Sequence, residues 1–445
     1  MPRLPDSVAF RLLWLLLLLV FILSSLIAAC SPGIKVESGN GAPLSQDTEA
    51  RPEPTKQPPE ESELPGSDDL ADKAVPQLSP DRKHLLRLWN SGFALTEFPT
   101  GKPEHTFPVE GNHRVIDFGW APGGDAFAYH TEHSEPGGSG GVYIARVDGS
   151  TEKLATLEPP KLGPRQMVWS PCGRYLFWDQ PFSIHDRNTG ETLIRKHINE
   201  SYQCVRSPLF VEGGSRMAFT LLEDDGSENL WVMDIDQGSI RQVTDADEGD
   251  YPFFWMNDST LLVRIGAIYT GGGLVYGLAS VDVETGSRAV VDMDSSPSIS
   301  PDGPPFRRIH VVRSISPKGD RLVGESRSLA GDDSRVYLLD LASGQRVTLL
   351  EGETPDEGFA IAQALWMDGG RILMNVVRQS YGEELSSSGS RYRILEYSGA
   401  DGFRTLAESA TRMQLLGVLG EKLYYLELDE TGSSWQVKHV APPTS

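Results

Sequence analysis

The ten residues 168–177, Val-Trp-Ser-Pro-Cys-Gly-Arg-Tyr-Leu-Phe, decide how the rest of the chain is interpreted. They begin with an apolar anchor, Trp169, pass through a Pro/Gly turn and end in an apolar strand. Related segments recur along the sequence, with anchors at Leu78, Trp120, Phe210, Trp255, Ile315, Trp366 and Leu416. Successive anchors lie 41 to 60 residues apart, which is typical of one four-stranded unit per repeat.

The remainder of each unit follows the same order. Second strands are predicted at 126–129, 175–178 and 261–263, and third strands at 142–145, 230–233 and 336–339. A glycine turn ends the third strand at positions 149, 190, 238, 286 and 344, where positive φ is needed. A short fourth strand such as 241–244 completes the unit. The pattern predicts an all-β fold, a β-propeller of eight four-stranded blades over 75–445. Seven blades remain an alternative, because both terminal repeats look short of a strand.

The repeat, apolar-Ser-Pro-x-Gly-Arg-x-apolar followed by apolar-aromatic-apolar-Asp and Thr-Gly, resembles the TolB-type, WD40-like propeller repeat. The resemblance covers about residues 75 to 440 and implies the fold. It implies no function, because one propeller fold serves many functions. TolB carries an α/β domain before its propeller, which this sequence lacks, so we transfer no TolB partner or binding residue.

The N-terminus has the features of an export signal. Arg3 and Arg11 precede an uninterrupted apolar run at 12–29, and Ile27-Ala28-Ala29-Cys30 follows the pattern of small residues before a cut site. These four residues resemble the bacterial lipobox, which implies that residues 1–29 are a lipoprotein signal peptide and that Cys30 carries a lipid such as palmitate. The alternative is an uncleaved membrane-spanning anchor helix. Either reading places the remainder outside the cytoplasm, in the periplasm or beyond.

Residues 30–74 are rich in Pro, Glu, Ser and Gly, and such a segment buries too little apolar surface to fold. We therefore expect a disordered tether between Cys30 and the propeller. The whole chain has 62 acidic and 40 basic residues, a net charge of −22, which makes nucleic acid an unlikely partner. Cys172 and Cys204 are expected near opposite ends of their strands, which disfavours a disulfide but leaves the question open.

Three groups of residues suggest chemistry only superficially. The run Gly137-Gly138-Ser139-Gly140-Gly141 matches G-x-S-x-G, but no helical pattern follows it, so a glycine-rich loop is the better interpretation. His130 and His133 lack metal-ligand spacing, and the acidic clusters near 223–225, 245–250 and 292–294 lack the EF-hand order and suit solvated turns. No catalytic residue, metal ligand or cofactor is assigned.

Long loops are predicted on one face, at 130–141, 264–273, 292–308 and 379–391. Loops on a rigid scaffold often bind ligands, so this face is the candidate binding surface; its residues are His130, His133, Tyr269, Arg307, Arg308, Arg378, Tyr381, Glu383 and Glu384. The favoured function is a binding or scaffolding module for a protein or an envelope polymer. The alternative is a stand-alone propeller enzyme, a hydrolase or lyase acting on peptides or glycans.

Overall fold

The computed structural model describes residues 75–441, apart from 90–91, 136, 159–165, 195–197, 199–203, 223–226, 246–248, 269–273, 293–307, 329–333, 352–356, 381–390 and 433. The chain divides into two units, Met1–Pro65 and Gly66–Ser445, and every described residue belongs to the second. The apolar run, Cys30 and the predicted tether therefore lie outside the described residues. Within the described part, no helix is long and apolar enough to cross a membrane.

The first four blades have four antiparallel strands each. Blade 1 contains β1 (Gln77–Leu78), β2 (His84–Trp89), β3 (Gly92–Glu97) and β4 (Pro103–Pro108). Blade 2 contains β5 (His113–Trp120), β6 (Ala126–His133), β7 (Gly140–Arg146) and β8 (Thr151–Leu157). Blade 3 contains β9 (Met167–Trp169), β10 (Tyr175–Trp178), β11 (Ser183–Asp186) and β12 (Glu191–Ile194). Blade 4 contains β13 (Cys204–Phe210), β14 (Arg216–Leu222), β15 (Glu228–Asp234) and β16 (Ser239–Gln242).

The other four blades repeat this order, except that the last has three strands. Blade 5 contains β17 (Gly249–Asn257), β18 (Thr260–Ile268), β19 (Leu274–Asp282) and β20 (Arg288–Asp292). Blade 6 contains β21 (Arg308–Ile315), β22 (Arg321–Ser328), β23 (Ser334–Asp340) and β24 (Arg346–Glu351). Blade 7 contains β25 (Glu357–Trp366), the 3-10 turn η2 (Asp368–Gly370), β26 (Ile372–Ser380), β27 (Arg391–Tyr397), the 3-10 turn η4 (Gly399–Asp401) and β28 (Phe403–Ser409). Blade 8 contains β29 (Met413–Leu419), β30 (Lys422–Leu428) and β31 (Trp435–Val440).

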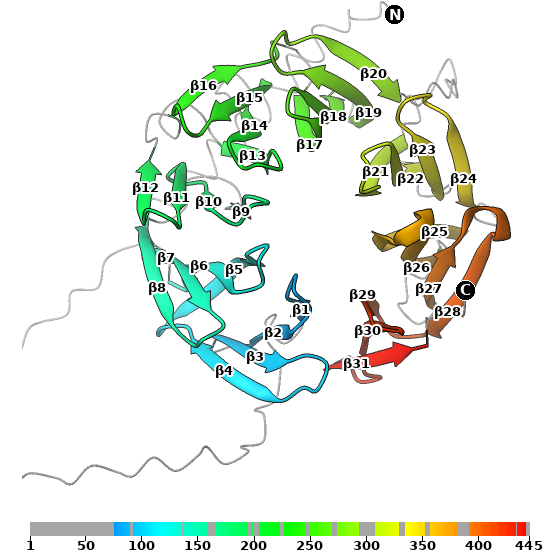
Figure 1. The fold of residues 1–445 in the computed structure, drawn as a ribbon, viewed down its shortest axis with the longest axis horizontal. Helices are drawn as coiled ribbons and strands as arrows, with labels where there is room; N and C mark the ends of the chain where they lie inside the picture. The colour runs from blue at the N-terminus through cyan, green and yellow to red at the C-terminus, as the bar shows by residue number, and fades with distance from the viewer. Residues whose placement is uncertain are drawn as a thin grey trace, which may run out of the picture. The chain divides into compact units, whose positions relative to one another are not determined.

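The eight sheets are arranged radially, with the first strand of each blade innermost (Figure 1). The prediction of an all-β, eight-bladed propeller is thus confirmed. In an antiparallel blade, the turns after the first and third strands lie at one end. The loop after the second strand and the connection to the next blade lie at the other. We call these ends the turn face and the linker face.

The repeat motif works as a hydrogen-bonded turn on the turn face. The hydroxyl oxygens of Ser79, Ser170 and Ser316 accept the backbone N–H five residues further on, at 3.0, 2.9 and 3.0 Å. All three serines are buried, so the turn is tied to the interior. The glycines predicted to need positive φ after the third strand have it, with values from +66° to +90° at positions 149, 190, 238, 286 and 344.

Three sequence-based boundaries need correction. In blade 8, Val418 pairs with Leu423 as Trp366 pairs with Ile372, so the last anchor is Val418 and not Leu416. The loop predicted at 130–141 is shorter, because β6 continues to His133 and β7 begins at Gly140. The strands on either side of the 264–273 loop likewise extend to Ile268 and from Leu274. Bulges and cross-strand pairing set these ends, and the apolar pattern alone does not report them.

The core is divided among the blade junctions, with one cluster of buried hydrophobic side chains between each pair of neighbouring blades. Tryptophan anchors add a polar tie in the inner ring. The indole N–H groups of Trp120, Trp169 and Trp255 donate to backbone oxygens of the preceding blade at 3.3, 3.0 and 3.1 Å. Each of these tryptophans therefore packs in the junction with the preceding blade. Its hydrogen bond also fixes the position of its strand relative to that blade.

A second polar tie comes from the second strands, three residues after the partner of the anchor. Thr220 donates to the backbone oxygen of Asp250 at 2.6 Å, and the carboxylate of Glu325 accepts the N–H of Ile361 at 3.1 Å. Asn375 donates in the same way to the backbone oxygen of Met413. All three side chains are buried, and each bonds to the inner strand of the next blade. Sequence analysis did not identify these three hydrogen bonds between neighbouring blades.

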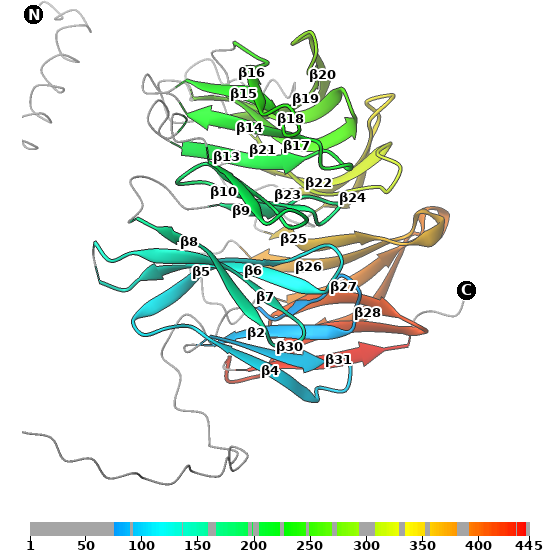
Figure 2. The same ribbon diagram turned by 60° about the vertical axis from the view of Figure 1, so that its left-hand side comes forward.

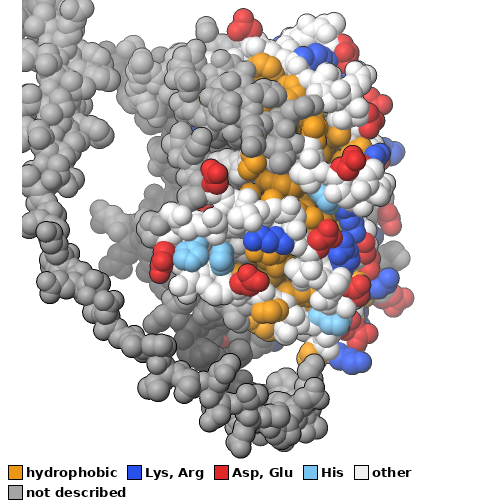
Figure 3. Space-filling model, turned by 90° about the vertical axis from the view of Figure 1, so that its left-hand side faces the viewer, with side chains coloured by type: hydrophobic (Ala, Val, Ile, Leu, Met, Phe, Trp, Pro, Cys, Tyr) orange, Lys and Arg blue, Asp and Glu red, His pale blue; other side chains and the backbone are white. Residues whose placement is uncertain are grey.

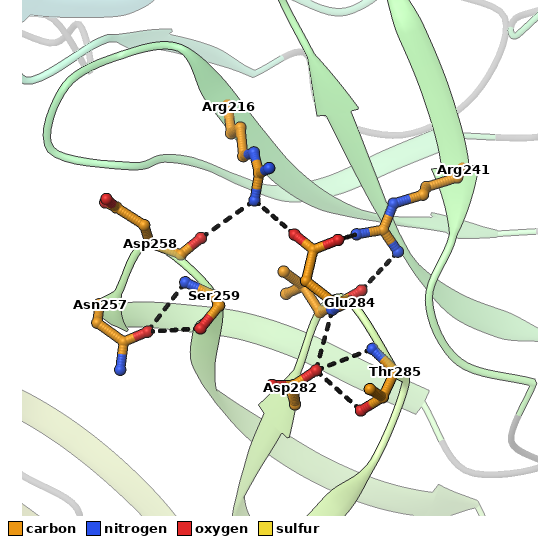
Figure 4. Close-up of polar contacts among 9 residues, drawn as sticks. Arg216, Arg241, Asn257, Asp258, Ser259, Asp282, Glu284 and Thr285 are labelled. Atoms are coloured by element: carbon orange, nitrogen blue, oxygen red, sulfur yellow. Dashed lines mark hydrogen bonds and ion pairs between the residues drawn. The ribbon is translucent and has the colours of Figure 1, made fainter.

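Ion pairs also connect blades 4 and 5 on the turn face (Figure 4). Glu284, in the turn after β19, accepts Arg216 of β14 at 2.7 Å and Arg241 of β16 at 3.0 Å. Asp282 holds the turn itself, since its carboxylate accepts the N–H and the hydroxyl of Thr285, both at 2.8 Å. Two arginines of blade 4 thus bind one carboxylate of blade 5.

The ring closes where blade 8 meets blade 1, and the two lie side by side in both ribbon views (Figures 1 and 2). The described strands share no sheet across this seam. Closure rests on a small cluster of Leu85, Phe98 and Tyr424, in which the two rings meet edge to face at 5.0 Å. Arg82 adds a hydrogen bond to the backbone oxygen of Val418.

Candidate functional site

A cleft of about 350 Å³ lies where blade 1 passes into blade 2. One wall is the β4–β5 connection and the other is the side of blade 2 that faces blade 1. The lining residues are Pro108, Val109, Glu110, His113, Tyr129, Thr131, Tyr143, Thr151 and Lys153. We call this site the blade 1–2 cleft. Figure 3, viewed from the side of blades 2 and 3, shows hydrophobic side chains exposed among charged ones on the rim.

The wall on blade 2 is a row of side chains set by strand register. Tyr129 of β6 is opposite Tyr143 of β7, which is opposite Lys153 of β8. The two phenol rings stack at 4.9 Å with an interplanar angle of 8°, and the ammonium nitrogen of Lys153 lies 5.7 Å from the centre of the Tyr143 ring. Burial raises the pKa of Tyr129, with smaller contributions from Tyr143 and Glu110, so its phenol stays neutral.

The glycine run makes room for this row. A Cβ on Gly141 would lie 2.7 Å from the Tyr143 ring, and one on Gly140 would lie 1.9 Å from the backbone oxygen of Thr131. A Cβ on Gly138 would lie 2.3 Å from the His133 ring. Three glycines of the G-x-S-x-G match are therefore explained by close packing around the cleft. Residues 137–139 lie between β6 and β7, as predicted, whereas Gly140 and Gly141 are the first residues of β7, and no helix follows the run.

Thr131 has a hydroxyl group without a visible partner. The residue lines the cleft, is 1 % exposed and has no hydrogen bond to its Oγ1 atom. A buried polar atom without a partner costs about 1–3 kcal/mol, so native proteins seldom keep one without a reason. The oxygen itself is closed off from solvent, so the Thr131 side chain would have to rotate before a ligand in the cleft could bond to it.

His113 closes the linker-face end of the cleft. Its Nδ1 atom lies 2.8 Å from the backbone oxygen of Glu110, and its Nε2 atom lies 2.9 Å from that of Ser139. His113 also meets the His133 ring edge to face at 5.1 Å. This histidine thus joins the β4–β5 connection to the glycine run, and the sequence alone gave no signal for it.

The residues predicted for a binding face are only partly described. His133 lies at the cleft end of β6, but His130 is 1 % exposed and cannot belong to an exposed surface. Arg378 is half-buried on β26, and Arg308 begins β21. The other five predicted residues, all on enlarged loops, lie outside the described residues: Tyr269, Arg307, Tyr381, Glu383 and Glu384.

The structure also shows where other residues noted in the sequence lie. Asp250, placed by sequence in a solvated acidic turn, is fully buried and lies 3.4 Å from Arg288. Cys172 is a free, exposed thiol in the β9–β10 turn, while Cys204 begins β13. Over the described ranges, no group of three or more His, Cys, Asp or Glu residues is placed to hold a metal ion.

Comparisons with known proteins found similarity among solved structures. No family model and no curated protein matches the chain. Among solved structures, one from a study of two prolyl endopeptidases aligns at 12 % identity and a TM-score of 0.48, covering 80 % of this chain and 53 % of that one. An oligogalacturonate lyase in complex with manganese aligns at 10 % identity and 0.44, covering 73 % and 87 %. The β-propeller domain of the Trilobed protease from Pyrococcus furiosus aligns at 13 % identity and 0.43, covering 74 % and 96 %.

Proposed function

We propose that this chain is an exported lipoprotein, anchored through Cys30, whose propeller is a binding module with its ligand site in the blade 1–2 cleft. The lipobox-like sequence before Cys30 supports the anchor. One observation carries the binding role: the cleft contains a buried hydroxyl, on Thr131, that lacks a hydrogen-bond partner. The sequence favours a protein or an envelope polymer as the partner, and the volume of the cleft, about 350 Å³, admits only a short piece of such a molecule.

Photo-cross-linking in intact cells tests the site. A benzophenone amino acid replaces Pro108, an exposed residue of the cleft, and in a second strain it replaces Val347 of β24, which is 45 % exposed and lies on blade 6. We expect a specific cross-linked product at position 108 and none at 347. Equal yields at both positions would contradict the proposal. Conversion of the captured ligand by the purified protein would identify an enzyme instead of a binding module.

The anchor has a separate test. Mass spectrometry of the mature N-terminus should find a lipid-modified Cys30, and Cys30→Ala should abolish the modification because the thioether needs that thiol. An unmodified Cys30 in the parent protein would contradict the anchor and leave the cleft proposal standing.

A further inference from the structure

The cleft carries one positive and one negative side chain that do not pair with each other. Lys153 stands on the β8 wall and Glu110 on the β4–β5 connection, and both are exposed. Neither has an ion pair in the part of the chain that the structure describes. Lysines without ion pairs are common in this protein, because Lys83 alone of the six described lysines has one, so what matters is that both charges line one cleft.

The same cleft is lined by groups that suit the middle of a ligand. Thr131 offers its unbonded hydroxyl, and the neutral phenol of Tyr129 can donate or accept. The volume, about 350 Å³, is at the small end of the range for ligand pockets. The cleft therefore fits a short ligand with a negative end, a polar middle and a positive end.

We propose that the blade 1–2 cleft binds short peptides with both termini free, with the α-carboxylate at Lys153, the α-ammonium at Glu110 and a backbone amide at Thr131. This inference rests on the proposed ligand site and names its chemistry. A sugar acid is the main competitor, because it would use Lys153 and the hydroxyl groups. It carries no positive charge for Glu110, so it accounts for fewer of the features.

Calorimetric titration of the full-length protein tests the assignment with four probes: trialanine, N-acetyl-trialanine, trialanine amide and glucuronate. Trialanine should bind, and capping either end should weaken binding about tenfold or more, as expected for loss of a charge-assisted hydrogen bond. Lys153→Met should remove the difference between trialanine and its amide. Glu110→Gln should remove the difference between trialanine and its N-acetyl form.

Lys102→Met is the matched control, because Lys102 is an exposed lysine of blade 1 that does not line the cleft. Circular dichroism confirms that each variant is folded. Equal binding of capped and free peptides, or tighter binding of glucuronate, would overturn the peptide assignment. If no probe binds while position 108 still cross-links in cells, the peptide assignment fails and the ligand site stands. If position 108 does not cross-link either, both fail.

Discussion

Two blade junctions built from the same repeat differ in how completely they are filled. Between blades 4 and 5, eleven buried hydrophobic residues form the core, a tryptophan anchor and Thr220 bond across it, and two arginines clasp Glu284. Between blades 1 and 2, seven buried and seven partly buried residues form the core, Trp120 bonds across it to Gln77, and the outer part is the cleft. The difference indicates that one junction is built for stability and the other leaves room for a ligand.

The difference comes from a few local choices. In blade 2, the residue opposite Gly141 is the polar Thr131, whereas in blade 5 the residue opposite Gly277, at the same place, is the apolar Ile265. In blade 5, the corresponding junction is packed by Trp255 and by valine and leucine side chains. The turns after the third strands are alike in both blades, since Gly149 and Gly286 both have positive φ. The repeat therefore fixes the scaffold, and single substitutions on the strands decide which junction stays open.

The largest effect is expected from Trp255→Ala in the filled junction. Trp255 is 8 % exposed and donates to Leu209 at 3.1 Å, so truncation should lower the free energy of unfolding by about 3–5 kcal/mol. Urea denaturation measures it. Trialanine binding should change less than twofold, and a stability loss below about 1 kcal/mol would show that this junction is not the stronger one.

Gly141→Ala, in the junction between blades 1 and 2, should reduce binding strongly and stability only slightly. The new Cβ would push the Tyr143 ring into the cleft, so trialanine binding should fall more than tenfold, at a stability cost of about 1 kcal/mol. Gly119→Ala is the control, since its Cβ would meet nothing within 4 Å on β5. Unchanged trialanine binding by the Gly141 variant would contradict the assignment of the ligand site to the cleft.

Glu284→Gln should have an intermediate effect, confined to stability. The Glu284 side chain is 51 % exposed, so losing both ion pairs should lower the free energy of unfolding by only about 1 kcal/mol. Glu351→Gln is a matched comparison, because Glu351 is 52 % exposed and pairs with Arg335 alone. A larger loss of unfolding free energy from Glu351→Gln would show that the two ion pairs of Glu284 do not give the junction extra stability.

The smallest effect is a pH dependence in blade 3. Arg174 donates to Asp186 at 2.7 and 3.1 Å and holds the pKa of Asp186 below its ordinary value of 3.8. A lowered folded-state pKa means that the stabilisation is present above pH 3.8 and is lost as the pH falls through the folded value. Asp186→Asn should therefore cost about 1 kcal/mol at pH 7 and less below pH 3.8. A constant difference in melting temperature across this range would contradict the pairing.

Most of the fold could be predicted from sequence because the repeat contains its own turn signals. Ser170 and Gly173 fix the hairpin locally, and so do their counterparts in other blades. The cleft could not be predicted in this way. Its wall depends on Tyr129, Tyr143 and Lys153 being opposite one another, which the cross-strand register decides. His113 was missed because its contacts are with backbone oxygens of a different strand connection.

Hydrogen–deuterium exchange of the full-length protein, with and without saturating trialanine, tests the central claim most directly. The account predicts slower exchange at residues 108–113 and 140–153, which carry the two walls of the cleft. It predicts no change at 249–284 in the filled junction between blades 4 and 5. Protection confined to other blades, or equal protection at both junctions, would contradict the assignment of the ligand site to the blade 1–2 cleft.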